Sequence, residues 1–305
     1  MDREKICEKI AMPENIREFL EYLYTPFDLE ILAATDNHGS VIQKYRKSWM
    51  EHLYNRGVLD KVINDNGKIR YKAGNITTRL ECFIVVEKAY WISLPPEVRN
   101  TINDRYIMNP DLWIPAMLEH PAYTETVRPI EECVKLLENS DTQYYYLAEC
   151  NCNNYLMNCD KDKYRICIHF PKEKPGINSL DARGISQRVT KEEALDALLY
   201  SEKIGMVHKA GPTEENFCNC CSCCCIHHHN TEKYNSQLKG GYIKTPYIIE
   251  LNQEKCIDCG ACAKRCPFGA LTYAEGKTEF HPEECWGCGV CRSVCPQEAL
   301  KIRRR

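Results

Sequence analysis

The last fifty residues of this chain contain the same arrangement of cysteines twice. Each copy has the spacing C-x2-C-x2-C-x3-C-P, and the second begins 29 residues after the first. One tight loop can therefore supply three sulfur atoms, and a proline, which has no N–H to donate, follows the fourth and ends the loop. The cysteines of the two copies are Cys256, Cys259, Cys262 and Cys266, then Cys285, Cys288, Cys291 and Cys295.

This spacing is the one that wraps four thiolates around an iron–sulfur cubane, and in two-cluster arrangements the fourth cysteine of each run binds the other cluster. Zinc ribbons instead use two C-x2-C pairs at a distance from each other. The pattern therefore predicts two [4Fe-4S] clusters. The predicted ligands are Cys256, Cys259, Cys262 and Cys295 for cluster 1, and Cys285, Cys288, Cys291 and Cys266 for cluster 2.

On these motifs, residues 242–305 resemble the bacterial two-[4Fe-4S] ferredoxin. The resemblance implies a ferredoxin-like fold and electron transport with a redox partner protein, either a reductase or a low-potential carrier.

The composition points to metal binding in the cytoplasm. Cysteine accounts for 21 of the 305 residues. The first residues lack the apolar segment of a signal peptide, and no apolar run is long enough to span a membrane. A cytosolic chain this rich in cysteine is expected to bind metal rather than form disulfides. Because oxygen destroys exposed clusters, an anaerobe is the expected setting.

The middle of the chain, residues 141–230, holds ten further cysteines. Six of them fall within eight consecutive positions, and adjacent residues cannot all face one core, so we expect them to bind metal. Ten thiolates suffice for two cubanes, for one larger cluster, or for one cubane with a mononuclear metal. The preferred hypothesis is at least one further iron–sulfur cluster that bridges both cysteine segments. Its upstream candidates are Cys152, Cys159 and Cys167, with Cys150 as a fourth, and its downstream candidates are Cys218, Cys220, Cys221, Cys223, Cys224 and Cys225.

Several other residues of this region have simpler expected roles. A strand is expected over residues 144–148, directly before Cys150. Three histidines, His227–His229, follow the last cysteines. They are expected to be exposed, with one of them as a ligand or hydrogen-bond donor as the alternative. The sequence Thr190-Lys-Glu-Glu193 predicts a capping box at the start of a helix between the cysteine segments. The region is similar to uncharacterised ferredoxin-fused proteins of anaerobes, and this resemblance implies no activity.

The first 140 residues are expected to be helical with one hairpin. Helical spacing covers residues 14–24, 28–34, 41–56, 75–94 and 97–106, and Gly57 is expected to end the third of these helices. Asn66-Gly67 predicts a two-residue turn between strands 58–63 and 68–72. Helices followed by a hairpin look like a winged helix. Basic residues outnumber acidic ones in residues 40–74, so DNA binding is an alternative to docking of a partner. Cys7, Cys82 and Cys133 are expected to be core residues.

Together these features predict an α+β chain. We expect a mainly helical docking domain with a winged-helix-like hairpin (1–140), a cysteine-rich metal-binding region (141–230), a linker (231–241) and a ferredoxin-like 2[4Fe-4S] domain (242–305). The preferred function is electron transfer between a low-potential carrier, the ferredoxin domain and a central cluster. The alternatives are an iron–sulfur reductase, that is, an oxidoreductase whose middle cluster binds substrate, and a redox-sensing DNA-binding regulator. No dinucleotide or Walker motif is present, and no catalytic residue is assigned.

Overall fold

The computed structural model describes residues 2–35, 45–109, 125–159, 161, 165–211, 215–229 and 242–305. It is a mixed α+β structure that divides into two compact units. The first unit comprises Met1–Asn109, Asn154–Leu156 and Pro175–Gln187, and the second comprises Pro110–Asn153, Met157–Lys174 and Arg188–Arg305. The predicted division at residues 140 and 230 stays a prediction, and the predicted linker lies outside the described residues.

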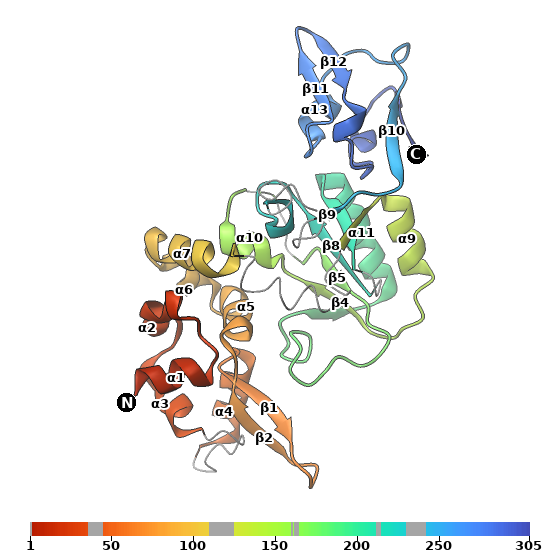
Figure 1. Ribbon diagram of the computed structural model, residues 1–305. Helices are drawn as coiled ribbons and strands as arrows, with labels where there is room; N and C mark the ends of the chain where they lie inside the picture. Colours follow the sequence, from red (N-terminus) through yellow and green to blue (C-terminus); the bar gives the residue numbers. More distant parts are fainter. Residues whose placement is uncertain are drawn as a thin grey trace. The chain divides into compact units, whose positions relative to one another are not determined.

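The first unit is a group of short helices with one hairpin (Figure 1). Strand β1 (Leu59–Ile63) pairs antiparallel with β2 (Ile69–Ala73), which confirms the predicted hairpin. The order of helices and hairpin matches the expectation for a winged helix, but order alone does not establish that fold, so the assignment stays a prediction. The helices are α1 (Arg3–Lys9), η1 (Glu14–Phe19), α2 (Leu20–Leu23), α3 (Pro26–Ala34), α4 (Lys47–Asn55), α5 (Ile76–Val86), α6 (Lys88–Ser93), α7 (Pro96–Ile102) and η2 (Asn103–Ile107).

Gly57 closes α4, as the sequence predicts. Its φ of +74° lies in the left-handed region, where a side chain is disfavoured. A Cβ atom there would also lie 2.7 Å from the carbonyl oxygen of Thr78 and 2.9 Å from the sulfur of Cys82. The glycine therefore permits both the helix end and the close approach of α5.

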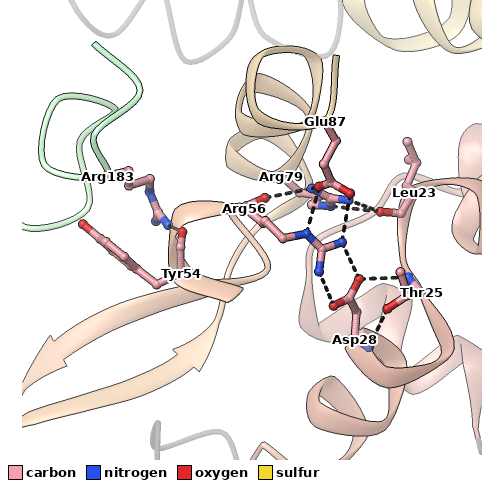
Figure 2. A network of polar contacts seen from close by, with 8 residues as sticks. All are labelled: Leu23, Thr25, Asp28, Tyr54, Arg56, Arg79, Glu87 and Arg183. Carbon is pink, nitrogen blue, oxygen red and sulfur yellow. Dashed lines mark hydrogen bonds and ion pairs between the residues drawn. The ribbon is translucent and has the colours of Figure 1, made fainter. Parts of the chain in front are cut away.

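A buried network of charged groups connects the helices of this unit (Figure 2). The Arg56 guanidinium donates to both carboxylate oxygens of Asp28, at 2.7 and 2.9 Å, and to both oxygens of Glu87, at 3.0 Å each. Arg79 donates to Glu87 at 2.5 Å and to the carbonyl oxygen of Leu23 at 2.6 and 2.9 Å. Asp28 is fully buried, so these bonds replace the water that its charge has lost.

The network explains an interruption that the sequence does not predict. Residues 75–94 form two helices instead of one, because α5 ends at Val86 and α6 begins at Lys88. Glu87, at the break, is the residue whose carboxylate binds Arg56 and Arg79. Its position is thus set by contacts with residues distant in the sequence.

The second unit contains a seven-stranded sheet with strand order β6-β4-β5-β8-β7-β3-β9. The described pairings are antiparallel, except that β3 and β9 are parallel. The predicted strand at residues 144–148 is confirmed as β4. The strands are β3 (Glu125–Arg128), β4 (Tyr145–Ala148), β5 (Cys167–His169), β6 (Gln187–Val189), β7 (Val207–Ala210), β8 (Asn216–Cys220) and β9 (Tyr242–Ile243).

Helices α9 (Ile130–Glu138) and α11 (Lys191–Ile204) cover one face of this sheet (Figure 1). The core between these two helices and the sheet includes Ile168 and Phe217 from the strands. Because side chains alternate along a strand, Cys167, Cys218 and Cys220 lie on the opposite face. The capping box of α11 is confirmed: Thr190 and Glu193 each accept a hydrogen bond from the other's backbone N–H. A short helix, α10 (Asn151–Leu156), follows β4.

The C-terminal part of the second unit is built around two cysteine loops. Strands β10 (Tyr247–Leu251) and β13 (Leu300–Arg304) pair antiparallel, as do β11 (Leu271–Ala274) and β12 (Lys277–Phe280). The loops carry α13 (Ala261–Arg265), η4 (Pro282–Glu284) and η5 (Arg292–Val294). Among the described residues of the whole chain, no helix is long and apolar enough to cross a membrane.

Candidate metal centres

The C-terminal loops surround two separate hollows, each lined by four cysteines. The first is lined by Cys256, Cys259 and Cys262 from one loop and by Cys295 from the other copy of the motif. The backbone N–H of Ala299 donates to the Cys295 sulfur at 3.2 Å, and that of Asp258 donates to the Cys256 sulfur at 3.4 Å. Such N–H groups stabilise negative charge on sulfur.

The second hollow is lined by Cys285, Cys288 and Cys291 together with Cys266 from the first copy. Burial raises the pKa of the Cys288 thiol to about 12, and it also raises the pKa values of Cys291 and Cys262. Buried thiols of this kind resist ionisation unless a bound cation compensates the charge. Sets of four sulfur donors in apolar hollows fit iron–sulfur clusters. The two sets contain the same residues as the sequence-based assignment, and ligation itself stays a proposal.

The ten cysteines of the middle region form two groups, not one. The four-cysteine group is Cys159, Cys221, Cys223 and Cys224, whose sulfur atoms all lie within 4.8 Å of one another. In the six-cysteine group each thiol hydrogen-bonds to the next in a spatial series. The order of the series is Cys220, Cys225, Cys152, Cys150, Cys167 and Cys218. The structure therefore separates Cys159 from the other upstream candidates, Cys150, Cys152 and Cys167.

Sheet pairing places half of the six-cysteine group. Ile168 of β5 pairs with Phe217 of β8, which puts the neighbouring residues Cys167 and Cys218 opposite each other. Cys218 and Cys220 lie on the same face of β8 because they are two residues apart. Cys218 and Cys220 also interact electrostatically, as do Cys218 and Cys225. The two ends of the hydrogen-bonded series thus lie near each other.

Hydrogen bonds between the thiols of the six-cysteine group raise the pKa values of Cys152, Cys167 and Cys220 and lower those of the other three. Hydrogen bonds from Cys152 and Cys167 hold the pKa of Cys150 well below its usual value. A hydrogen bond from Cys167 lowers the pKa of Cys218 to about 6. Burial raises the pKa of Cys225, but hydrogen bonds from Cys152 and Cys220 outweigh that effect and lower it.

Lys209 is a neighbour of this group that the sequence analysis missed. Its side chain lies on β7 opposite Cys218 and is almost fully buried. Burial lowers the pKa of Lys209. The negative charge of the nearby sulfurs of Cys220, Cys218 and Cys225 together raises it by more, so the net shift of this pKa is upward. A lysine within the apolar strand Val207–Ala210 was the available signal, because unpaired lysine is almost never fully buried.

The histidines are less exposed than expected. His228 is buried, which corrects the expectation of exposure for that residue, and its ring centroid lies 5.5 Å from that of Phe268. His229 is half-buried, and its Nε2 lies 3.2 Å from the carbonyl oxygen of Cys223. His208 is fully buried between Asn219 and Glu202. The contact of His228 with Phe268, which follows the first cysteine motif, contributes to the burial of that histidine.

The ferredoxin-like loops and the sheet share a buried cluster of side chains. Cys288 and Val290, from the second cysteine loop, belong to the same packed cluster as Cys220 and Cys225 of the six-cysteine group. Phe268 stacks on Trp286 at a centroid distance of 5.1 Å beside this cluster. Arg265 also donates to the carbonyl oxygens of Glu202 and Lys203 at the end of α11, at 2.8 and 2.7 Å. The second hollow is therefore the one adjacent to the six-cysteine group.

Three cysteines take no part in these groups. Cys7, Cys82 and Cys133 are buried in the cores, which confirms their expected packing role. Burial raises the pKa of the Cys82 thiol to about 12 and that of Cys133 as well, as expected for inert core thiols.

Comparison with known proteins agrees with the chemistry of the C-terminal loops. Residues 255–299 match a family described as the 4Fe-4S dicluster domain. Neither the curated proteins nor the solved structures gave a match. The chain therefore carries a 4Fe-4S dicluster ferredoxin domain near its C-terminus, which implies two [4Fe-4S] clusters, and a cluster of cysteines in its middle region.

Proposed function

We propose that this chain is an electron-transfer protein in which the ferredoxin domain and the six-cysteine group exchange electrons. The observation that carries the proposal is the packed cluster that contains both Cys288 and the pair Cys220 and Cys225. Electron transfer needs short distances between centres and little rearrangement of the surrounding atoms. Direct packing of one centre's cysteine loop against the cysteines of another supplies the short distance.

The ligands that we assign follow the two hollows. Cys256, Cys259, Cys262 and Cys295 would hold cluster 1, and Cys285, Cys288, Cys291 and Cys266 would hold cluster 2. Bound [4Fe-4S] clusters supply one-electron chemistry at potentials set by hydrogen bonds and burial. The chain contributes the N–H donors of Ala299 and Asp258 to the first set, and a buried aromatic pair, Phe268 and Trp286, beside the second.

For the six-cysteine group we propose a further iron–sulfur cluster. The group has six sulfurs, more than the four that one cubane requires, so members that are not neighbours in the hydrogen-bonded series can bind different iron atoms. Lys209 places a positive charge beside them, which offsets part of the negative charge of a thiolate-bound cluster. The redox partner of the whole chain is a reductase or carrier protein that reaches the ferredoxin domain.

The alternative functions gain less support. The basic hairpin that suggested DNA binding includes Lys61, whose ammonium group forms an ion pair with Glu51 at 2.7 Å. Glu51 also accepts a hydrogen bond from Tyr71 at 2.5 Å. The charge of Lys61 is thus paired within the first unit and contributes less to attracting DNA phosphates. DNA binding remains a prediction.

A double substitution of Cys220 and Cys225 by serine tests the proposal. The wild-type holoprotein, purified without oxygen, is expected to accept more electrons from a limiting reductant than the variant, because the variant loses part of the six-cysteine group. The EPR signals of the ferredoxin clusters should remain in both proteins. Cys133→Ser is the matched control, since that buried cysteine lies outside all the groups. Equal electron uptake by wild type and the double variant would contradict the proposal.

A further inference from the structure

The four-cysteine group is more compact than an iron–sulfur cubane requires. All four sulfur atoms lie within 4.8 Å of one another. The Cys223 and Cys221 sulfurs are 3.2 Å apart, and those of Cys224 and Cys159 are 3.8 Å apart. These separations are the basis for identifying what the group binds.

Sulfur separation distinguishes one metal ion from a cluster. Four thiolates around one Zn²⁺ stand at about 2.3 Å from the ion, which places neighbouring sulfurs of a tetrahedron about 3.8 Å apart. In a cubane each thiolate binds a different iron atom, so its sulfurs must stand farther apart. The observed separations, of which two are 3.2 and 3.8 Å and none exceeds 4.8 Å, are closer to those of a single ion than to those of a cubane. We propose that Cys159, Cys221, Cys223 and Cys224 bind one Zn²⁺ ion, separate from the iron–sulfur centres.

The surroundings of the group fit a closed structural site. Apolar residues pack against it, including the buried side chains of Ile166 and Met206, and Cys159 and Cys223 are half-buried. The Asn153 side-chain amide lies beside two of the sulfurs, with its oxygen 3.2 Å from the sulfur of Cys224 and 3.9 Å from that of Cys159. With four protein sulfurs around the ion, no position remains open for substrate, which is the arrangement of structural zinc sites.

Hydrogen bonds hold the turn formed by residues 221–224, which carries three of the four proposed ligands. The carbonyl oxygen of Cys223 accepts a hydrogen bond from the Asn158 amide at 3.0 Å and lies 3.2 Å from His229 Nε2. The backbone N–H of Cys225 donates to the carbonyl oxygen of Cys221 at 3.2 Å, closing the turn. The ligand sulfurs are thus held near one another by the fold of the chain.

The zinc ion would have a defined effect on the neighbouring redox group. Cys220 and Cys225, two members of the six-cysteine group, directly flank the turn formed by residues 221–224. An ion that ties this turn to Cys159 sets the spacing between those two cysteines. Because Zn²⁺ has no redox chemistry, it positions these ligands without accepting electrons.

Metal analysis of two variants tests the inference. In wild type purified without oxygen we expect about one zinc per chain in addition to the iron. Cys159→Ser and Cys224→Ser should each lose that zinc while the ferredoxin EPR signals persist. Cys133→Ser, the control, should retain it. Absence of zinc from wild type, loss of a single iron in its place, or loss of about four iron atoms from either variant would overturn the inference.

Cobalt substitution of the wild-type chain provides a second measurement that does not depend on how the variants fold. Co²⁺ in a four-thiolate tetrahedral shell should give intense thiolate-to-metal absorption, and added Zn²⁺ should abolish it. A disulfide between Cys221 and Cys223, detected by mass spectrometry after alkylation of the anaerobic protein, would overturn the inference. The ferredoxin clusters are counted separately by their iron and EPR signals, so failure of the zinc site is distinguishable from failure of the proposed electron-transfer function.

Discussion

Replacing Cys266 by serine is expected to remove cluster 2 and leave cluster 1 in place. Cys266 belongs to the first motif in the sequence, but in the structure it lines the hollow formed by Cys285, Cys288 and Cys291. The variant should lose about four iron atoms per chain. Its EPR spectrum should change from that of two interacting centres to that of one isolated centre.

The reciprocal variant is the matched control. Cys295 belongs to the second motif but lines the first hollow, so Cys295→Ser should remove cluster 1 instead. The redox potential that remains in Cys266→Ser should match that in Cys285→Ser, and the potential in Cys295→Ser should match that in Cys256→Ser. If Cys266→Ser instead resembles Cys256→Ser, the assignment of ligands across the two motifs is wrong.

Replacing Arg56 by alanine is expected to destabilise the first unit strongly. The substitution leaves Asp28 fully buried without its guanidinium partner and removes one of the two arginines that bind Glu87 (Figure 2). Removing one partner of a buried ion pair typically costs about 3–5 kcal/mol. Hydrogen exchange of peptides from α3 and α5 measures this loss within the first unit.

An exposed ion pair in the same unit provides the comparison. Arg105 binds Glu18 at 2.6 Å, but both side chains are about half exposed or more, at 48% and 61%. Arg105→Ala should therefore cost no more than about 1 kcal/mol. If Arg56→Ala and Arg105→Ala have equal effects on exchange, the buried network does not stabilise the unit as described.

Local signals in the sequence predicted the elements whose causes are themselves local. The cysteine spacing, the Asn66-Gly67 turn, the Thr190 capping box and the glycine that closes α4 each act through neighbouring residues. The interruption at Glu87 was not predicted, because the carboxylate of Glu87 binds Arg56, which lies far away in the sequence, as well as Arg79.

The arrangement of the middle cysteines could be predicted only in part. The sequence predicted that the ten thiols bind metal, but their spacing could not divide them into groups. Alternation along β8 directs Cys218 and Cys220 to one face, and the turn that follows directs Cys221, Cys223 and Cys224 to a second group. That division depends on where the strand ends, and boundaries of elements are the least predictable feature of a sequence.

Iron and sulfide analysis of the anaerobically purified chain, followed by an EPR-monitored redox titration, tests the central claim most directly. The account predicts at least about eight iron atoms per chain with matching sulfide, and two interacting paramagnetic centres on reduction. A chain whose C-terminal cysteines hold zinc or no metal, and which gives no EPR signal on reduction, would contradict it.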